Sequence, residues 1–173
     1  MNVKLGPIKK EYLPIYVKWF NDSELTQYLL MYRPMNLEQE EDWYKNAIKK
    51  ENEIYLAILI DDPEEKMIGS CSINIDWRNR VGNVGITIGE KKLRGKGLGT
   101  EAMIKLCEYG FNTLNLQRIE LETYEFNERA FKSYKKVGYV EEGRRRKAIF
   151  ANGKYWDAIT MGLLADEWNK KKK

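Results

Sequence analysis

The residues best placed to do chemistry form a glycine-rich run, Arg94-Gly95-Lys96-Gly97-Leu98-Gly99-Thr100. It follows a β-like stretch, 84–88, and precedes a helix-like stretch, 101–114. Glycine lets the backbone adopt positive φ and approach a ligand closely, and the first N–H groups of a helix have no partner within it. The run therefore predicts a cradle for a phosphate-containing ligand, with Arg94 and Lys96 as additional cations.

Two common phosphate loops do not fit this run. A Walker A loop needs a Ser or Thr after its lysine, but Lys96 is followed by Gly97. A dinucleotide loop needs G-x-G-x-x-G, whereas Gly95, Gly97 and Gly99 alternate. The pattern that fits is Arg-x-x-Gly-x-Gly, with Arg94 as its first residue. It resembles the pyrophosphate loop of the GNAT superfamily of acetyl-CoA-dependent N-acetyltransferases.

A second motif spans residues 127–139. Asn127 suits a helix N-cap and Gly138 suits a helix end. Apolar residues fall on one face at helical spacing, at Ala130, Phe131, Tyr134 and Val137. The pattern Asn-x-x-Ala-x-x-x-Tyr also resembles the last motif of GNAT enzymes, at a similar distance after the glycine loop. The alternative is that Tyr134 is only a core residue of an amphipathic helix.

The resemblance covers roughly residues 67–164 and is strongest to one branch, the ribosomal-protein N-terminal acetyltransferases and the bacterial spermidine acetyltransferases. It implies an α+β fold of three layers, in which helices flank a mixed, mostly antiparallel central sheet. Residues 1–173 then form a single domain, with a frayed basic tail at 170–173.

The resemblance also implies transfer of an acetyl group from acetyl-CoA to a primary amine. Loop N–H groups would hold the pyrophosphate, and strand 86–88 would pair with the pantetheine amides. Asn127 either contacts the coenzyme or only caps its helix, and Lys136 faces phosphate or water. The predicted cofactor-binding residues are Ile86, Thr87, Ile88, Arg94, Gly95, Lys96, Gly97, Leu98, Gly99, Thr100, Asn127 and Lys136.

Tyr134 is the predicted catalytic residue, because in the resembling enzymes the tyrosine at this position gives its proton to the leaving thiolate. The general base stays open. Relatives place a glutamate where this chain has Asn83-Val84, so Glu90, Glu122, Glu125 or a water chain remain as alternatives.

The acceptor pocket is expected around residues 28–34, with Tyr28, Tyr32 and Arg33 as substrate residues and Trp43 nearby. Spermidine acetyltransferases carry acidic residues here, so Arg33 favours a neutral or anionic acceptor: an amino sugar, another small amine or a protein N-terminus. The alternatives are a spermidine acetyltransferase and a non-catalytic acetyl-CoA-binding module.

Composition narrows the chemistry. The chain has no histidine and only two cysteines, Cys71 and Cys107, both in apolar contexts. This argues against hydrolase triads, disulfides and a metal site. A net charge of +4 suits an anionic ligand but does not by itself indicate nucleic acid. Without a signal-like start or a long apolar run, we expect no membrane span and a cytoplasmic location.

The basic run Arg144-Arg145-Arg146-Lys147 has two interpretations. Charges commonly protect an exposed edge strand, and they can also contact RNA or a ribosome. Relatives are often dimers or larger, so a homodimer is possible.

Periodicity and turn signals predict the elements that position these residues. Asn152-Gly153 predicts a tight β-hairpin, and Asn36 with Gln39 predicts a capping box. Strands are expected over 5–8, 53–60, 67–76, 118–124, 139–151 and 155–164, with another ending at 89. Helices are expected over 11–20, 23–31, 36–50, 101–114 and 128–137.

Overall fold

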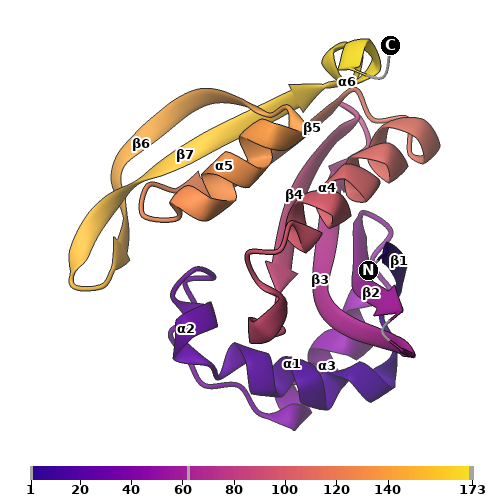
Figure 1. The fold of residues 1–173 in the computed structure, drawn as a ribbon, viewed down its shortest axis with the longest axis vertical. Helices are drawn as coiled ribbons and strands as arrows, with labels where there is room; N and C mark the ends of the chain where they lie inside the picture. Colours follow the sequence, from indigo (N-terminus) through magenta and orange to yellow (C-terminus); the bar gives the residue numbers. More distant parts are fainter. Residues whose placement is uncertain (1, 62, 172–173) are drawn as a thin grey trace.

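The protein is described by a computed structural model that covers residues 2–61 and 63–171 (Figure 1). Within these residues one seven-stranded sheet runs through the molecule in the order β1-β2-β3-β4-β5-β7-β6. The strands are β1 (Val3–Pro7), β2 (Glu53–Asp61), β3 (Glu65–Asp76), β4 (Val81–Ile88), β5 (Arg118–Tyr124), β6 (Val140–Ala151) and β7 (Lys154–Leu164).

The central feature of the sheet is the contact between β4 and β5, the only parallel neighbours among the described strands. Their pairing covers only Val81 to Asn83 against Arg118 to Glu120. Beyond these residues the two strands diverge, as Figure 1 shows, while β4 stays paired with β3 as far as Ile88. The divergence leaves one edge of the remaining β4 residues open to a ligand.

Helices cover both faces of the sheet. The α-helices are α1 (Leu13–Phe20), α2 (Ser23–Thr26), α3 (Leu37–Ala47), α4 (Leu98–Glu108), α5 (Glu128–Val137) and α6 (Ala165–Lys171). Short turns of other helix types are η1 (Lys10–Tyr12), η2 (Lys91–Leu93) and η3 (Tyr109–Thr113).

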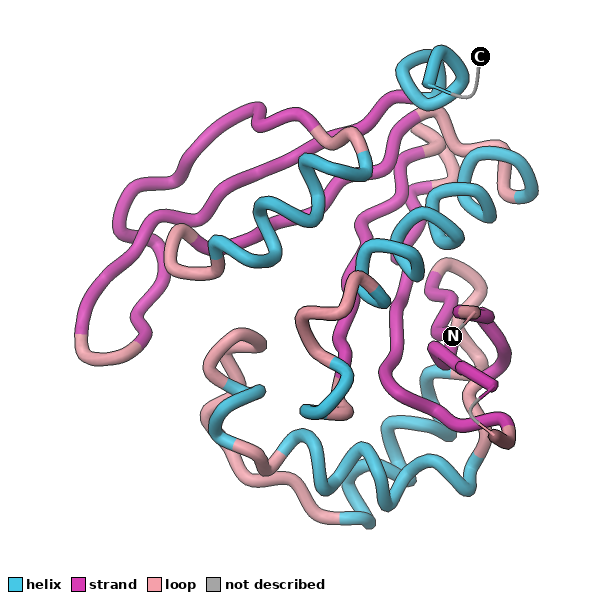
Figure 2. The backbone as a smooth tube through the Cα atoms, viewed as in Figure 1, coloured by secondary structure: helices cyan, strands magenta, loops and turns pink. Residues whose placement is uncertain are grey.

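Two hydrophobic cores hold these layers together. The larger one joins α4 to the sheet through buried residues such as Met103, Ile73 and Ile119. The smaller one packs α1 against the opposite face, where Tyr16 and Trp19 meet residues of β2 and β3. The sheet therefore separates the α4 and α5 side from the α1 and α3 side (Figures 1 and 2).

Several predicted elements are confirmed with small shifts in their ends. β5 matches its predicted range, and the Asn36–Gln39 capping box is formed. Asn152 and Gly153 have φ of 53° and 77°, as a two-residue hairpin turn requires. The fold class is confirmed as a mixed, mostly antiparallel sheet flanked by helices.

Other predictions were wrong in extent. The helix predicted over 23–31 ends at Thr26, and Leu30 takes a left-handed φ of 54°. The helix predicted from 101 begins at Leu98, because Gly97 already caps it. α6 was not predicted; it includes Lys170 and Lys171, so these two residues do not belong to a frayed tail, and 172–173 lie outside the described residues.

Candidate active site

A cavity of about 990 Å³ opens where β4 and β5 diverge. Its walls come from β3, β4, the glycine-rich loop, α5 and the α1–α3 layer. The structure brings most of the predicted site residues to this one cavity. They are Tyr28, Ile86, Thr87, Ile88, Arg94, Gly95, Gly97, Gly99, Thr100, Asn127, Tyr134 and Lys136.

The loop that precedes α4, whose backbone Figure 2 draws, contributes Arg94, Gly95 and Gly97 to the lining of the cavity. Gly95 and Gly97 have φ of 78° and 84°, and no heavy atom lies within 4 Å of an added Cβ at either position. Backbone conformation, and not space, therefore requires glycine here. Gly97 caps α4, so the unpaired N–H groups of its first turn lie beside the cavity. Leu98 turns its side chain into the core, and Lys96 is exposed and does not line the cavity.

The guanidinium of Arg94 forms its contacts with other residues of the protein. Nε donates to the Ile88 carbonyl at 3.0 Å and Nη2 donates to the Gly89 carbonyl at 2.7 Å. Nη2 also lies 3.7 Å from a carboxylate oxygen of Asp22, and the side chain is only 11% exposed. The contacts tie the start of the loop to the end of β4 and to the N-terminus of α2.

α5 forms the wall facing the loop. The Asn127 side chain accepts a hydrogen bond from Ala130 N at 3.3 Å, which confirms it as the N-cap. Ser133 and Thr100 share a hydrogen bond of 2.7 Å between their hydroxyl oxygens, so α5 and the first turn of α4 are held together. Lys136 is exposed at the rim.

Tyr134 lies on the inner face of α5 and lines the cavity. Its ring packs edge-on against Tyr139, with ring centroids 5.9 Å apart. Burial raises the pKa of its phenol to about 12, so the hydroxyl keeps its proton at neutral pH. A protonated phenol at a cavity wall can serve as a proton donor.

The opposite wall contains a residue that the sequence analysis missed. Glu40 is 2% exposed on the inner face of α3 and lines the cavity with Tyr16, Trp43 and Tyr55. Burial raises the pKa of the Glu40 carboxyl to about 7. The sequence could have indicated that Glu40 is buried, because helical spacing places it on the same face as Trp43, Tyr44 and Ala47.

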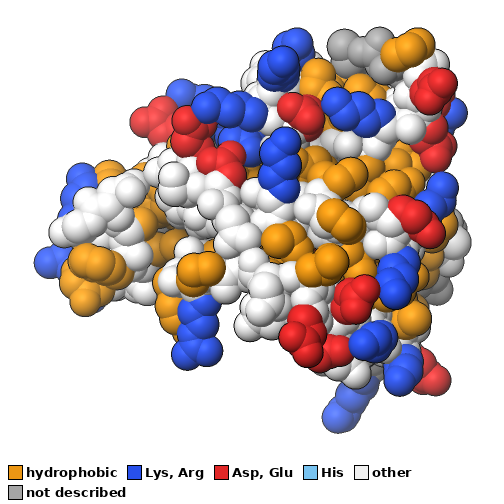
Figure 3. All heavy atoms as spheres, turned by 90° about the horizontal axis from the view of Figure 1, so that it is seen from below, with side chains coloured by type: hydrophobic (Ala, Val, Ile, Leu, Met, Phe, Trp, Pro, Cys, Tyr) orange, Lys and Arg blue, Asp and Glu red, His pale blue; other side chains and the backbone are white. Residues whose placement is uncertain are grey.

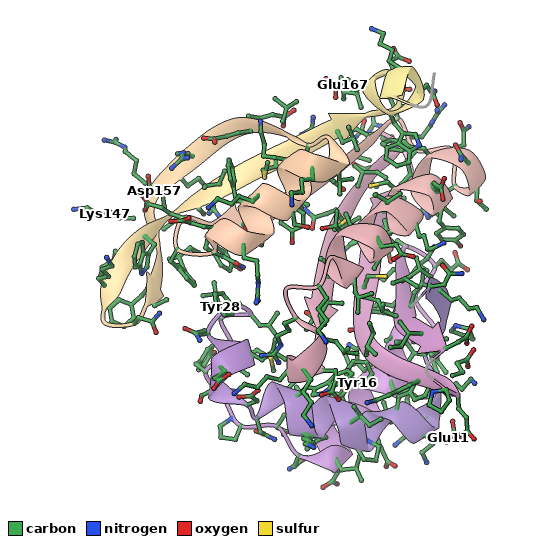
Figure 4. The ribbon with its side chains drawn as sticks, viewed as in Figure 1. Glu11, Tyr16, Tyr28, Lys147, Asp157 and Glu167 are labelled. Atoms are coloured by element: carbon green, nitrogen blue, oxygen red, sulfur yellow. The ribbon has the colours of Figure 1, made fainter. Side chains whose placement is uncertain are left out.

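The predicted acceptor residues separate in the structure. Tyr28 lines the cavity and stacks on Phe126, with ring centroids 5.9 Å apart, where Figure 4 shows it facing α5 and the β6–β7 hairpin. Tyr32 is 85% exposed, and Arg33 lies beside it; neither lines the cavity, and their role toward an acceptor stays a prediction. The Asn21 side chain bonds both backbone groups of Met35, which itself lines the cavity. Tyr28 and Met35 on the two sides of this loop therefore reach the cavity, whereas Tyr32 and Arg33 between them do not.

The carboxylates considered as bases are mostly engaged elsewhere. Glu90 lies 3.5 Å from Lys66, and Glu125 accepts from Asp157 N at 3.3 Å; neither lines the cavity. Glu122 lines it but forms an ion pair with Arg145.

Both cysteines are buried and unpaired, as the sequence predicts, and burial raises each thiol pKa to about 12. Within 2–61 and 63–171, no three potential ligands of the His, Cys, Asp or Glu type gather as they would for a metal ion. In the same residues, no helix is long and apolar enough to cross a membrane.

A phosphate cradle beside an open strand edge, with a phenol on the facing helix, is an arrangement that can hold an extended ligand with a phosphate group and amides. The family model for the acetyltransferase (GNAT) domain matches residues 2–140, and the chain therefore belongs to the GNAT acetyltransferase family. It is accordingly an N-acetyltransferase with acetyl-CoA as the donor.

Relatives of known or assigned activity span different acceptors. The chain is 27% identical to spermidine N(1)-acetyltransferase of Escherichia coli over 96% of this chain and 88% of that protein. It is 34% identical to the putative ribosomal N-acetyltransferase YdaF of Bacillus subtilis over 70% of this chain and 64% of that protein. A crystal structure of the Vibrio cholerae spermidine N-acetyltransferase with CoA and spermine shares the fold, with a TM-score of 0.90, 24% identity, and coverage of 97% and 98% of the two chains.

Proposed function

We propose that this protein acetylates the primary amine of a small molecule, with Tyr134 as the proton donor. The observation that carries the proposal is one continuous cavity, which joins the glycine loop, the open edge of β4 and the phenol of Tyr134. The phosphate cradle fits the pyrophosphate of coenzyme A, and the edge of β4 at 86–88 offers backbone groups to its amides.

In this proposal the loop N–H groups from Gly95 to Thr100 bind phosphate. Arg94 keeps the loop in place and does not itself contact the phosphate. Two observations support this division: the guanidinium already donates to Ile88 and Gly89, and the first turn of α4 borders the cavity. Lys96 and Lys136 are exposed cations near the cradle and contribute long-range attraction for phosphate.

A small amine is supported over the other predicted acceptors. Arg33 argued against a polyamine, but its side chain does not line the cavity, so that argument no longer applies. The relative from Escherichia coli is named for acetylation of spermidine. A protein N-terminus stays the second candidate, since YdaF is named as a putative ribosomal enzyme.

The test is acetyl-CoA-dependent thiol release with a panel of amines. The panel holds spermidine, glucosamine 6-phosphate, an aminoglycoside and peptides with Ser, Thr or Ala at the N-terminus. Fast release with a small amine supports the proposal. Thiol release with the peptides alone favours a protein N-terminus as the acceptor. Tight acetyl-CoA binding without thiol release in the presence of any amine would favour a non-catalytic acetyl-CoA-binding module.

Three further expectations stay predictions. Arg144 and Arg145 are already paired with Glu141 and Glu122 on an exposed edge strand, which supports protection of the edge over RNA contact. A cytoplasmic location agrees with two buried, unpaired thiols. Self-association is supported by a dodecameric structure of the Vibrio cholerae relative.

A further inference from the structure

Glu40 is a buried carboxylate without a partner. Its side chain is 2% exposed, and among the described residues none forms a hydrogen bond or an ion pair with its carboxylate. Tyr16 lies beside it, and the buried hydroxyl of Tyr16, whose polar neighbour is Ser70, forms no hydrogen bond with the carboxylate. An isolated buried charge destabilises a fold, so a carboxylate in this position suggests that a ligand supplies the missing cation.

The surroundings of Glu40 suit an ammonium group. The Tyr16 and Trp43 ring centroids are 6.2 Å apart, and those of Trp43 and Tyr55 are 5.0 Å apart. Aromatic faces attract cations through their quadrupoles, and a carboxylate beside them adds a full negative charge. The titratable groups recorded around the pair of Glu40 and Tyr16 are Tyr12, Tyr55 and Cys71, which include no cation.

Strand register places this recess on the acceptor side of the sheet. Tyr55 lies opposite Ser72, and Ser72 lies opposite Gly85, so the three residues share one face. α1 and α3 cover that face, and Figure 4 shows Tyr16 between α1 and the sheet. The cations that line the cavity come from the loop and α5 instead; they are Arg94, Arg129, Lys132 and Lys136. The carboxylates that line the cavity are Glu40, Glu122 and Glu128. Glu122 pairs with Arg145 and Glu128 with Lys132, so among the described lining residues Glu40 is the carboxylate left without an ion pair, and it lies on the α1–α3 side.

We propose that Glu40, within the recess of Tyr16, Trp43 and Tyr55, binds the ammonium group of a small cationic acceptor and takes its proton. This inference rests on the proposed acetyl transfer and names its acceptor class and its base.

The step balances in protons and electrons. One ammonium proton passes to the Glu40 carboxylate, and the freed lone pair forms the N–C bond to the acetyl carbon. The C–S bond breaks, the sulfur keeps the electron pair, and Tyr134 gives it a proton. The second amine proton restores the phenol, and Glu40 releases the first proton to water.

The experiment compares Glu40→Gln with the matched control Glu41→Gln. Glu41 is the next residue on α3, but it is only partly buried and lies 3.3 Å from Lys10. For spermidine, we expect Glu40→Gln to lower kcat/KM by at least about 100-fold and to weaken spermidine binding to the CoA-loaded protein at least tenfold by calorimetry. Acetyl-CoA affinity should stay within twofold, and the melting temperature should stay level or rise, whereas Glu41→Gln should behave as wild type.

The two proposals fail in different ways. If the wild type releases no thiol with any amine, the proposed function is wrong. If Glu40→Gln keeps the wild-type kcat/KM and binding for spermidine, or if only anionic or neutral acceptors react with the wild type, acetyl transfer stands and the role of Glu40 is overturned. A loss of melting temperature with unchanged amine binding would make Glu40 a structural residue.

Discussion

At the scale of single residues, Tyr134 and Tyr139 show how position gives the same side chain different surroundings. Tyr139 is fully buried and Tyr134 partly buried, and their rings pack edge to face. Tyr134 lines the cavity, whereas the Tyr139 hydroxyl contacts Cys107 and Met103 in the core. Desolvation also disfavours a thiolate leaving into this site, so a nearby phenol that still holds its proton suits the task.

Replacing Tyr134 by Phe removes only the hydroxyl. We expect kcat to fall by roughly 10²- to 10⁴-fold, the usual range for a general acid, with acetyl-CoA affinity nearly unchanged. Steady-state kinetics and calorimetry measure the two quantities. Tyr139→Phe is the matched control, because it makes the same change outside the cavity, and equal kcat losses in both variants would contradict a catalytic role for Tyr134.

Glu40 also predicts a pH dependence of stability. Burial raises its pKa from an ordinary value of 4.5 to about 7. The folded protein therefore binds this proton more tightly than the unfolded chain, and the stabilisation is complete below pH 4.5 and lost as pH rises through 7. Each unit of pKa difference corresponds to about 1.4 kcal/mol.

Glu40→Gln should abolish that loss of stability. Urea unfolding at a series of pH values, subtracted from the wild-type series, should show the variant gaining relative stability between pH 4.5 and 7. Glu41→Gln should show no such difference curve. If the difference in unfolding free energy between Glu40→Gln and the wild type does not change with pH, the Glu40 carboxyl of the wild type titrates as an exposed carboxyl does.

At the scale of elements, the junction between β4 and α4 is organised by Arg94. Its two hydrogen bonds end on Ile88, the last residue of the strand, and on Gly89 after it, and its ion pair reaches Asp22, the N-cap of α2. The planar fork of arginine fits two neighbouring carbonyls in a way that the single ammonium of lysine does not.

Arg94→Lys separates the two roles that an arginine can have here. If Arg94 positions the loop, Arg94→Lys and Arg94→Gln should both weaken acetyl-CoA binding, by about tenfold or more, since hydrogen bonds to charged groups contribute about 1.5–3 kcal/mol. If its charge acted directly on phosphate, lysine would restore binding and glutamine would not. Calorimetric Kd values for both variants decide between these cases.

At the scale of the whole molecule, the β6–β7 hairpin extends from the body as an arm (Figure 1). Phe150 and Tyr155 are opposite each other near its tip, 61% and 63% exposed, with ring centroids 5.1 Å apart. In the view from below, apolar side chains gather at the outer end of this arm (Figure 3). Exposed aromatic side chains on a projecting element are typical of a contact between protein molecules.

We expect the protein to self-associate through this arm. Replacing both Phe150 and Tyr155 by Ala should lower the molar mass measured by light scattering after gel filtration, with the melting temperature of the domain nearly unchanged. Replacing Trp77, which is 49% exposed in the turn between β3 and β4, is the control. An unchanged molar mass, or a monomeric wild type, would contradict this use of the arm.

Local patterns in the sequence determined much of this protein. The Gly95–Gly97 loop, the Asn36 and Asn127 caps and the Asn152-Gly153 turn were all predictable, because each depends on the conformational preferences of a few adjacent residues. Family resemblance then connected the loop with Tyr134, which the structure places on one cavity.

Only the tertiary structure decided which residues meet across the sheet. Arg33 looked like an acceptor residue from its place in the chain, but its guanidinium lies over the Tyr32 ring and does not line the cavity, although Met35 in the same loop does. Glu40 looked like one more charge on an amphipathic helix, but α3 packs that face against Tyr16 and the sheet. Local preferences act over a few residues, whereas burial and pairing depend on segments far apart in the chain, and a single sequence does not specify their contacts.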